Sequence, residues 1–171
     1  LSPALGIGTF CTHTVVSAKQ AVKVPAACPP EQASLLGCGV TTGVGAALYT
    51  AGVRRGSSVA VFGCGGIGNS VIMGAKLARA TRIIGVDIAN NKLDWTKQFG
   101  ATDVVNASKV EPVEAIKQLT GGHGVDYSFE AVGTPQTLLQ ALWARDLAGT
   151  CTLIGVPDPT MKVELPMLQF F

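Results

Sequence analysis

The chain has 171 residues, enough for one domain and a short additional segment. Its 13 basic and 11 acidic residues give a net charge of +2, which argues against the strongly basic surface of proteins that bind nucleic acid or anionic membranes. Charged residues make up only 14%, and 21 residues are glycine. The low charge indicates surface that further protein covers. The glycines indicate backbone that turns tightly or approaches a ligand closely.

Two stretches without charged residues, 32–53 and 56–75, have the length of a membrane span. Both are interrupted by glycine, serine and threonine, and no belt of aromatic and basic residues flanks them, so we expect no membrane insertion. No secretory signal is visible, although the chain begins with Leu1 rather than methionine. The five cysteines are an odd number without a C-x-x-C pair. They favour a reducing, cytoplasmic location.

The first 56 residues lack the regular pattern of the rest of the chain. A segment rich in threonine and valine, residues 12–16, is expected to form a strand. Pro30 favours the start of a helix. We expect this helix to break at Gly37-Cys38-Gly39 and to resume with Thr41 or Thr42 as the new cap.

From residue 57 onward, short β-branched runs alternate with helical stretches. We expect strands at residues 58–62, 82–87, 103–105, 125–129 and 150–156, and helices at 66–80, 90–99, 112–119 and 135–145. The strands read as continuous runs of valine and isoleucine rather than alternating ones, as parallel strands buried on both faces do. The sequence therefore predicts an α/β fold, a doubly wound parallel sheet with helices on both faces.

A glycine-rich turn follows the first of these strands and opens the next helix. Gly63-Cys-Gly-Gly-Ile-Gly68 fits G-x-G-x-x-G, and Asp87 ends the following strand, 19 residues after Gly68. Together they form a dinucleotide-binding fingerprint, in which helix N–H groups face the pyrophosphate. Asp87 can accept both hydroxyls of the adenosine ribose and would repel a 2′-phosphate. The pattern therefore favours NAD over NADP as the cofactor.

Two further strand ends lie on the same edge of the predicted sheet, at residues 131–133 and 154–156. Because ligands of open α/β sheets bind at this edge, we expect both beside the nicotinamide half of the coenzyme. Lys92 lies one helical turn after Asp87 and is expected to reach the same ribose, although a surface lysine is an equal interpretation. The predicted coenzyme contacts are Gly63, Gly65, Gly66, Ile67, Gly68, Asp87, Lys92, Val132, Gly133, Ile154, Gly155 and Val156.

Taken together, these motifs resemble the zinc-dependent alcohol dehydrogenases of the medium-chain dehydrogenase/reductase family. The matching segments follow that family's order and are Leu35-Leu-Gly-Cys-Gly-Val-Thr-Thr-Gly43, Val61-Phe-Gly-Cys-Gly-Gly-Ile-Gly68, Ile83-Ile-Gly-Val-Asp87, Phe99-Gly-Ala-Thr102, Gly124-Val-Asp126 and Leu153-Ile-Gly-Val-Pro157. Within the family, residues 92–95, 144–149 and 168–171 look most similar to S-(hydroxymethyl)mycothiol dehydrogenase and related alcohol dehydrogenases.

The resemblance implies a Rossmann domain for NAD at residues 28–171, lacking its last strand. Residues 1–27 would be a remnant of the β-rich, GroES-like catalytic domain. Cys38 matches the last of three protein ligands of the catalytic zinc, and Thr42 matches the residue that packs on the nicotinamide ring. No further catalytic residue is present, and the other zinc ligands would precede this segment. A small buried thiol is the alternative interpretation of Cys38 by itself.

The resemblance also implies hydride transfer between NAD and a small alcohol, aldehyde or thiol-hemiacetal, with S-(hydroxymethyl)mycothiol as one candidate. The segment alone would be inactive, and the whole enzyme would be a homo-oligomer joined near residues 161–165. Nucleic acid and membranes are not expected as partners. The remaining cysteines and both histidines match no ligand position.

Three other functions stay open. A zinc-free NAD(P)H quinone or enoyl reductase of the same superfamily is disfavoured by Cys38 and Asp87. A module that senses NAD(H) without chemistry shares the fingerprint. A methyltransferase would explain the glycine-rich turn, but the strand ends at 131–133 and 154–156 disfavour it.

Overall fold

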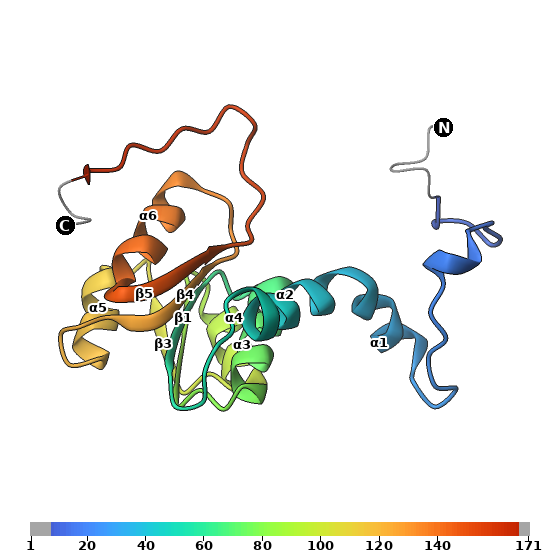
Figure 1. Cartoon of the computed structure of the whole chain (residues 1–171), viewed down its shortest axis with the longest axis horizontal. Helices are drawn as coiled ribbons and strands as arrows, with labels where there is room; N and C mark the ends of the chain where they lie inside the picture. The colour runs from blue at the N-terminus through green and yellow to red at the C-terminus, as the bar shows by residue number, and fades with distance from the viewer. Residues whose placement is uncertain (1–7, 168–171) are drawn as a thin grey trace. The chain divides into compact units, whose positions relative to one another are not determined.

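The computed structural model describes residues 8–167 (Figure 1). Residues 1–7 and 168–171 lie outside the described part of the chain, and so does the last segment of the finer resemblance. The chain divides into two units, Leu1–Ser34 and Leu35–Phe171.

In the first unit, residues 8–34 contain a 3-10 turn, η1 (Ala18–Gln20), and the start of helix α1 (Pro30–Leu35), but no strand. The strand expected at residues 12–16 is therefore wrong. None of the sheet's strands pairs with this segment, and Val15 is 99% exposed. A β-branched run with neither a hydrogen-bonding neighbour nor a buried face has nothing to hold it as a strand.

The second unit is built around a parallel sheet in the order β3-β2-β1-β4-β5. The strands are β1 (Ser58–Phe62), β2 (Arg82–Asp87), β3 (Asp103–Asn106), β4 (Val125–Glu130) and β5 (Arg145–Leu153), and the intervening helices are α3 (Gly66–Leu77), α4 (Asn90–Phe99), α5 (Pro112–Leu119) and α6 (Pro135–Ala144). This order confirms the predicted Rossmann-like sheet. Its winding reverses between β1 and β4, which makes that position the topological switch point.

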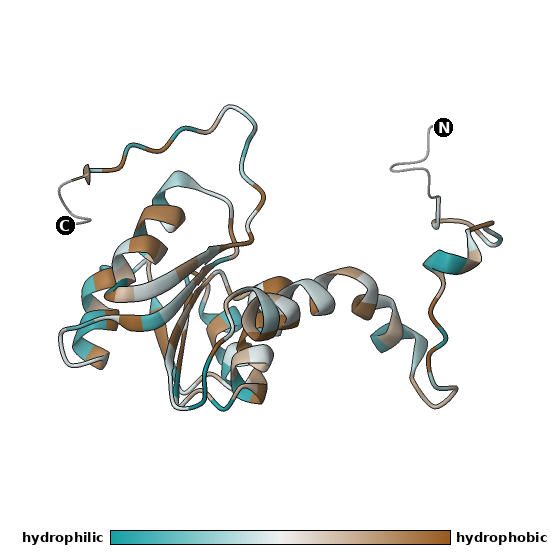
Figure 2. Ribbon diagram, in the orientation of Figure 1, coloured by the Kyte–Doolittle hydropathy of each residue, from teal (hydrophilic) through white to brown (hydrophobic). Residues whose placement is uncertain are grey.

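The two faces of the sheet have separate hydrophobic cores. Val59 and Val61 of β1 belong to a cluster with α3, whereas the alternate residues, Ala60 and Phe62, belong to a cluster with α5 and α6. Figure 2 shows hydrophobic residues along the central strands. Because helices cover both faces, the central strands β1 and β2 are buried along nearly their whole length rather than at alternate residues.

A continuous helical run precedes the sheet, formed by α1, η2 (Leu36–Val40), α2 (Thr41–Gly45) and η3 (Ala46–Thr50). The break expected at residues 37–39 is wrong. Val40 and Thr41 both have helical dihedral angles, and the Thr41 hydroxyl donates back to the carbonyl of Leu36 instead of capping a new helix. Residues Leu36–Val40 form a wider, π-helical turn, which Gly37 and Gly39 permit.

By length and composition alone, Pro30–Thr50 is the one helix in the described part of the chain that could cross a membrane. Its last turns nevertheless belong to the core. Ala46 and Ala47 are buried, and a Cβ added to Gly74 of α3 would lie 2.8 Å from the Cβ of Ala47. Residues 41–50 thus pack closely against α3, as a helix of a folded domain does.

The last strand matches the expected range, 150–156, only in part. β5 starts earlier, with an irregular register against β4, and ends at Leu153. The N–H groups of Ile154 and Gly155 then both donate to the main-chain oxygen of Glu130, at 2.8 and 3.0 Å. Because two successive donors converge on one acceptor, the chain turns out of the sheet here.

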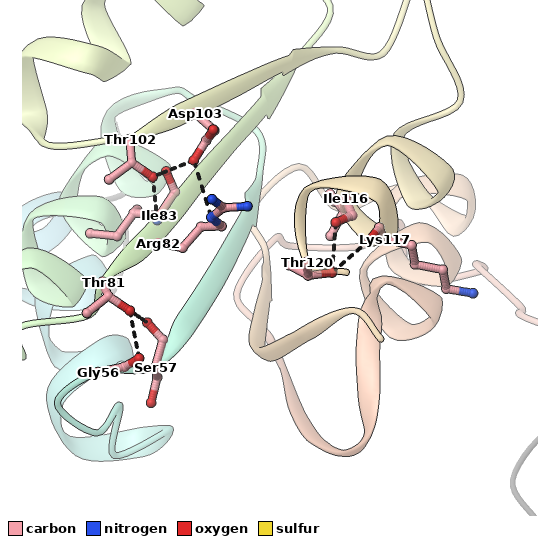
Figure 3. A network of polar contacts seen from close by, with 10 residues as sticks. All are labelled: Gly56, Ser57, Thr81, Arg82, Ile83, Thr102, Asp103, Ile116, Lys117 and Thr120. Carbon is pink, nitrogen blue, oxygen red and sulfur yellow. Dashed lines mark hydrogen bonds and ion pairs between the residues drawn. The ribbon is translucent and has the colours of Figure 1, made fainter. Parts of the chain in front are cut away.

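Polar contacts join the starts of neighbouring strands (Figure 3). The Thr81 hydroxyl donates to the carbonyl of Gly56 at 2.7 Å, and Arg82 Nε lies 3.7 Å from Asp103 Oδ2. The ion pair is partly exposed and therefore contributes little stability. These contacts lie at the amino ends of the strands, so they leave the carboxyl ends free for a ligand.

Candidate coenzyme site

A hollow of about 460 Å³ lies at the carboxyl ends of β1, β2 and β4, beside the switch point. Open α/β sheets bind ligands in this position. The hollow brings together five of the predicted contacts, namely Gly63, Gly65, Asp87, Lys92 and Val132. It is also lined by Thr134, Thr137 and Gln140 near the start of α6, none of which was predicted as a coenzyme contact.

The glycine-rich turn is shaped for an anion. Gly63 has φ +94°, and a Cβ on Gly68 would lie 1.7 Å from the carbonyl oxygen of Gly63, so neither position accepts a side chain without strain. A Cβ on Gly65 or Gly66 would meet nothing within 4 Å. No side chain caps α3, so its first N–H groups have no side-chain acceptor and can bind an anion.

The carboxylate of Asp87 is held at the edge of the hollow by two main-chain donors. Cys64 N–H donates to Oδ2 at 2.9 Å, and Ala89 N–H donates to Oδ1 at 3.0 Å. Lys92 Nζ lies 3.8 Å from Oδ2. Since each carboxylate oxygen has two lone pairs, Asp87 can still accept hydrogen bonds from a ligand. Asp87 and Lys92 therefore lie side by side at the hollow, and their contact with a ribose stays a prediction.

Cys64, between Gly63 and Gly65 in the turn, has a buried side chain that is 1% exposed. Burial raises the pKa of its thiol to about 11, and the nearby Asp87 carboxylate acts in the same direction. The thiol is therefore protonated at neutral pH, and it packs as an apolar group rather than acting as a ligand or nucleophile.

Two buried polar residues support the turn and escaped the sequence analysis. Asn69 Nδ2 donates to the carbonyl of Cys64 at 3.1 Å, and Asn69 Oδ1 accepts from the Thr96 hydroxyl at 2.7 Å. Asn69 is on α3 and Thr96 is on α4, so the pair joins both helices to the turn. The only signal in the sequence is polar residues at positions that face the core.

A second hollow, of about 420 Å³, is lined by Thr42, Tyr49 and Ile154, among others. The two strand ends expected beside the nicotinamide line different hollows, Val132 that of Asp87 and Ile154 that of Thr42. Val156 is 88% exposed.

The two strand ends nevertheless touch. A Cβ on Gly155 would lie 2.3 Å from the main-chain nitrogen of Gly133, and a Cβ on Gly133 would lie 2.5 Å from the oxygen of Val156. Glycine at these positions therefore allows one turn to pack directly on the other.

Glu130, the last residue of β4, is a third residue that the sequence analysis missed. Its side chain is buried, and Oε1 accepts from the main-chain N–H groups of Val132 and Gly133, both at 2.8 Å. The same oxygen accepts from the Thr137 hydroxyl at 2.7 Å. Glu130 therefore shapes the turn that lines the first hollow. Its signal in the sequence was a carboxylate at the last position of a predicted buried strand, directly before the turn at residues 131–133.

Cys38 lies in the π-helical turn and is exposed. Across the described residues, no group of three or more histidine, cysteine, aspartate or glutamate side chains could hold a metal ion. A zinc site needs about three protein ligands. These residues therefore do not make up a zinc site, and Cys38 can supply one ligand at most.

Comparison with known proteins agrees with this geometry. The family model described as zinc-binding dehydrogenase matches residues 66–171, more than half of the chain. A structure described as an alcohol dehydrogenase zinc-binding domain protein from Burkholderia ambifaria is 42% identical, with a TM-score of 0.82 over 86% of this chain and 40% of that one. Benzyl alcohol dehydrogenase from Acinetobacter calcoaceticus is 36% identical, with the same TM-score and coverage.

An alcohol dehydrogenase from Thermus sp. ATN1 is 31% identical, with a TM-score of 0.77 over 85% of this chain and 42% of that one. The chain thus spans about two fifths of the length of these relatives. The family match, the sheet order and the glycine-rich turn agree, and the chain belongs to the zinc-binding dehydrogenase family, among the zinc-type alcohol dehydrogenases.

Proposed function

We propose that this chain is the NAD-binding part of a zinc-type alcohol dehydrogenase. The observation that carries the proposal is the hollow at the switch point, where the uncapped start of α3 and the carboxylate of Asp87 lie together. The first suits a pyrophosphate and the second suits a ribose with free hydroxyls.

In this proposal, Asp87 and Lys92 hold the adenosine ribose, and the N–H groups of Ile67 and Gly68 bind the pyrophosphate. The nicotinamide half extends toward the hollow of Thr42 and Ile154. When bound, NAD supplies the acceptor for a hydride from the substrate. The residues of this chain bind and orient the coenzyme, and the apolar walls of the hollow exclude water.

The substrate is proposed to be an alcohol or a thiol-hemiacetal, with S-(hydroxymethyl)mycothiol as one candidate. Cys38 would provide one zinc ligand, and protein outside these 171 residues would provide the others. Residues 1–171 alone should therefore oxidise no alcohol. We further propose that the whole enzyme is cytoplasmic and forms a homo-oligomer. A monomer found by light scattering of the whole enzyme would contradict the proposed oligomeric state.

Titration of residues 1–171 with NADH, followed by coenzyme fluorescence, tests the proposal directly. We expect saturable binding that NAD⁺ displaces, and weaker binding of NADPH. Asp87→Ala should weaken NADH binding, and Asp94→Ala is its matched control, because Asp94 is an exposed acidic residue of α4. Absence of NADH binding, or equal affinity for NADPH, would contradict the proposal. Alcohol oxidation by residues 1–171 at the rate of a full-length relative would contradict their inactivity.

A further inference from the structure

Glu130 places a buried negative charge at the carboxyl end of β4. The residue is 1% exposed, and none of the ion pairs among residues 8–167 involves it. Its partners are instead the two N–H groups and the hydroxyl that donate to Oε1. An oxygen that accepts from three donors has the pattern of an ionised carboxylate. A buried carboxylate without a cation beside it is rare, because its desolvation is costly.

This carboxylate also adjoins the turn after β5. A Cβ added to Gly155 would lie 2.5 Å from Oε2, so the backbone of Gly155 packs directly on the carboxylate. The main-chain oxygen of Glu130 accepts from the N–H of Ile154, which lines the hollow of Thr42. Glu130 therefore lies between the two hollows and contacts the walls of both.

A dinucleotide crosses the sheet edge at the switch point, with one half on each side. Asp87 ends β2 and fixes the adenosine ribose on that side in the proposed function. The nicotinamide half must then extend over the ends of β4 and β5, where Glu130 lies. The charge of Asp87 is on the other side, and Lys92 at 3.8 Å partly neutralises it. Glu130 is thus a buried carboxylate at this part of the edge, and none of the ion pairs among the described residues involves it.

The nicotinamide ring carries one positive charge in NAD⁺ and none in NADH. We propose that Glu130 sets the relative affinity of the site for the two forms, stabilising the oxidised coenzyme through its buried charge. This inference rests on the proposed function, since it takes NAD(H) as the ligand. At an effective dielectric constant of about 20, the attraction between unit charges about 10 Å apart corresponds to a roughly tenfold change in affinity. Salt screens this attraction and reduces the change.

The test compares the dissociation constants of NAD⁺ and NADH in residues 1–171 and in two variants. Glu130→Gln keeps the shape and removes the charge, so the ratio Kd(NAD⁺)/Kd(NADH) should rise by about threefold to tenfold. Glu130→Asp keeps the charge and shortens the reach to Val132 and Gly133. It should therefore raise both constants together, with a smaller change in their ratio.

A purely structural role for Glu130 would raise both constants equally in either variant, because a displaced turn affects both forms of the coenzyme. An unchanged ratio in folded Glu130→Gln would therefore overturn the inference. If that variant does not fold, Thr137→Lys places an ammonium group beside Oε1 and should shift the ratio in the same direction. If the unchanged chain binds neither coenzyme, the proposed function itself is wrong, whatever the variants show.

Discussion

The main-chain N–H of Cys64 donates to Oδ2 of Asp87 at 2.9 Å. This bond joins the glycine-rich turn to the end of β2, so the group suited to a ribose and the backbone suited to a pyrophosphate are held together. Hydrogen bonds to a carboxylate are stronger than those between neutral groups. The two halves of the fingerprint are therefore positioned by each other before any ligand binds.

Replacing Asp87 by alanine should weaken NADH binding by about tenfold or more, equivalent to about 1.4 kcal/mol. The ribose loses its acceptor, and the N–H groups of Cys64 and Ala89 lose theirs. The preference for NADH over NADPH should also narrow, because the charge that repels a 2′-phosphate is removed. Parallel fluorescence titrations with both coenzymes measure the two effects, and an unchanged preference would count against the role given to Asp87.

Gly68→Ala and Gly66→Ala form a matched pair within one turn of α3. The Gly68 variant should unfold more readily, by about 1–3 kcal/mol or more, because its Cβ would lie 1.7 Å from the oxygen of Gly63. The Gly66 variant should fold normally, since its Cβ meets nothing within 4 Å, yet bind NADH more weakly because the methyl group occupies the space for phosphate. Thermal unfolding and NADH titration of both variants separate these effects.

Thr96→Val should destabilise the domain by about 1–3 kcal/mol, because the buried Oδ1 of Asn69 loses its donor. Asn69→Ala should also weaken NADH binding, since the carbonyl of Cys64 is released. A double-mutant cycle measured by denaturant unfolding should show that the two changes are coupled. Additive effects would mean that the hydrogen bond between the two side chains contributes nothing.

The Cys64 thiol should make stability depend on pH in the alkaline range. Its pKa is about 11 in the folded protein against 9.0 without the fold, so the unfolded chain releases this proton first as pH rises. The stabilisation is complete below pH 9 and is lost progressively toward pH 11, by an amount on the order of 2 kcal/mol. The free energy of unfolding, measured in urea between pH 8 and 11, should therefore fall more steeply with pH in the unchanged chain than in the Cys64→Ala variant.

The same burial should protect Cys64 from alkylation. In the folded chain at pH 8, iodoacetamide should modify the exposed Cys38 and leave Cys64 unmodified. Mass spectrometry of the digested protein measures both sites. Equal modification would show that the turn opens readily.

The sequence by itself determined most of the second unit. Its central strands can be predicted because burial on both faces favours continuous β-branched runs. Its turn can be predicted because only glycine fits at Gly63 and Gly68. Asp87 was placed by its distance along the chain from that turn. These are local or short-range requirements, so they are visible in residue type and spacing.

The tertiary structure decided what depends on partners distant in the sequence. Residues 12–16 have strand-like composition but no neighbouring strand to pair with, and the helix continues through Gly37 and Gly39 as a π-helical turn. Only the fold shows that Asn69 and Thr96 meet beneath the turn, and that Glu130 lies between the two strand ends. These contacts join residues that are distant in the sequence and meet only when the sheet assembles, so the spacing of residue types along the chain does not predict them.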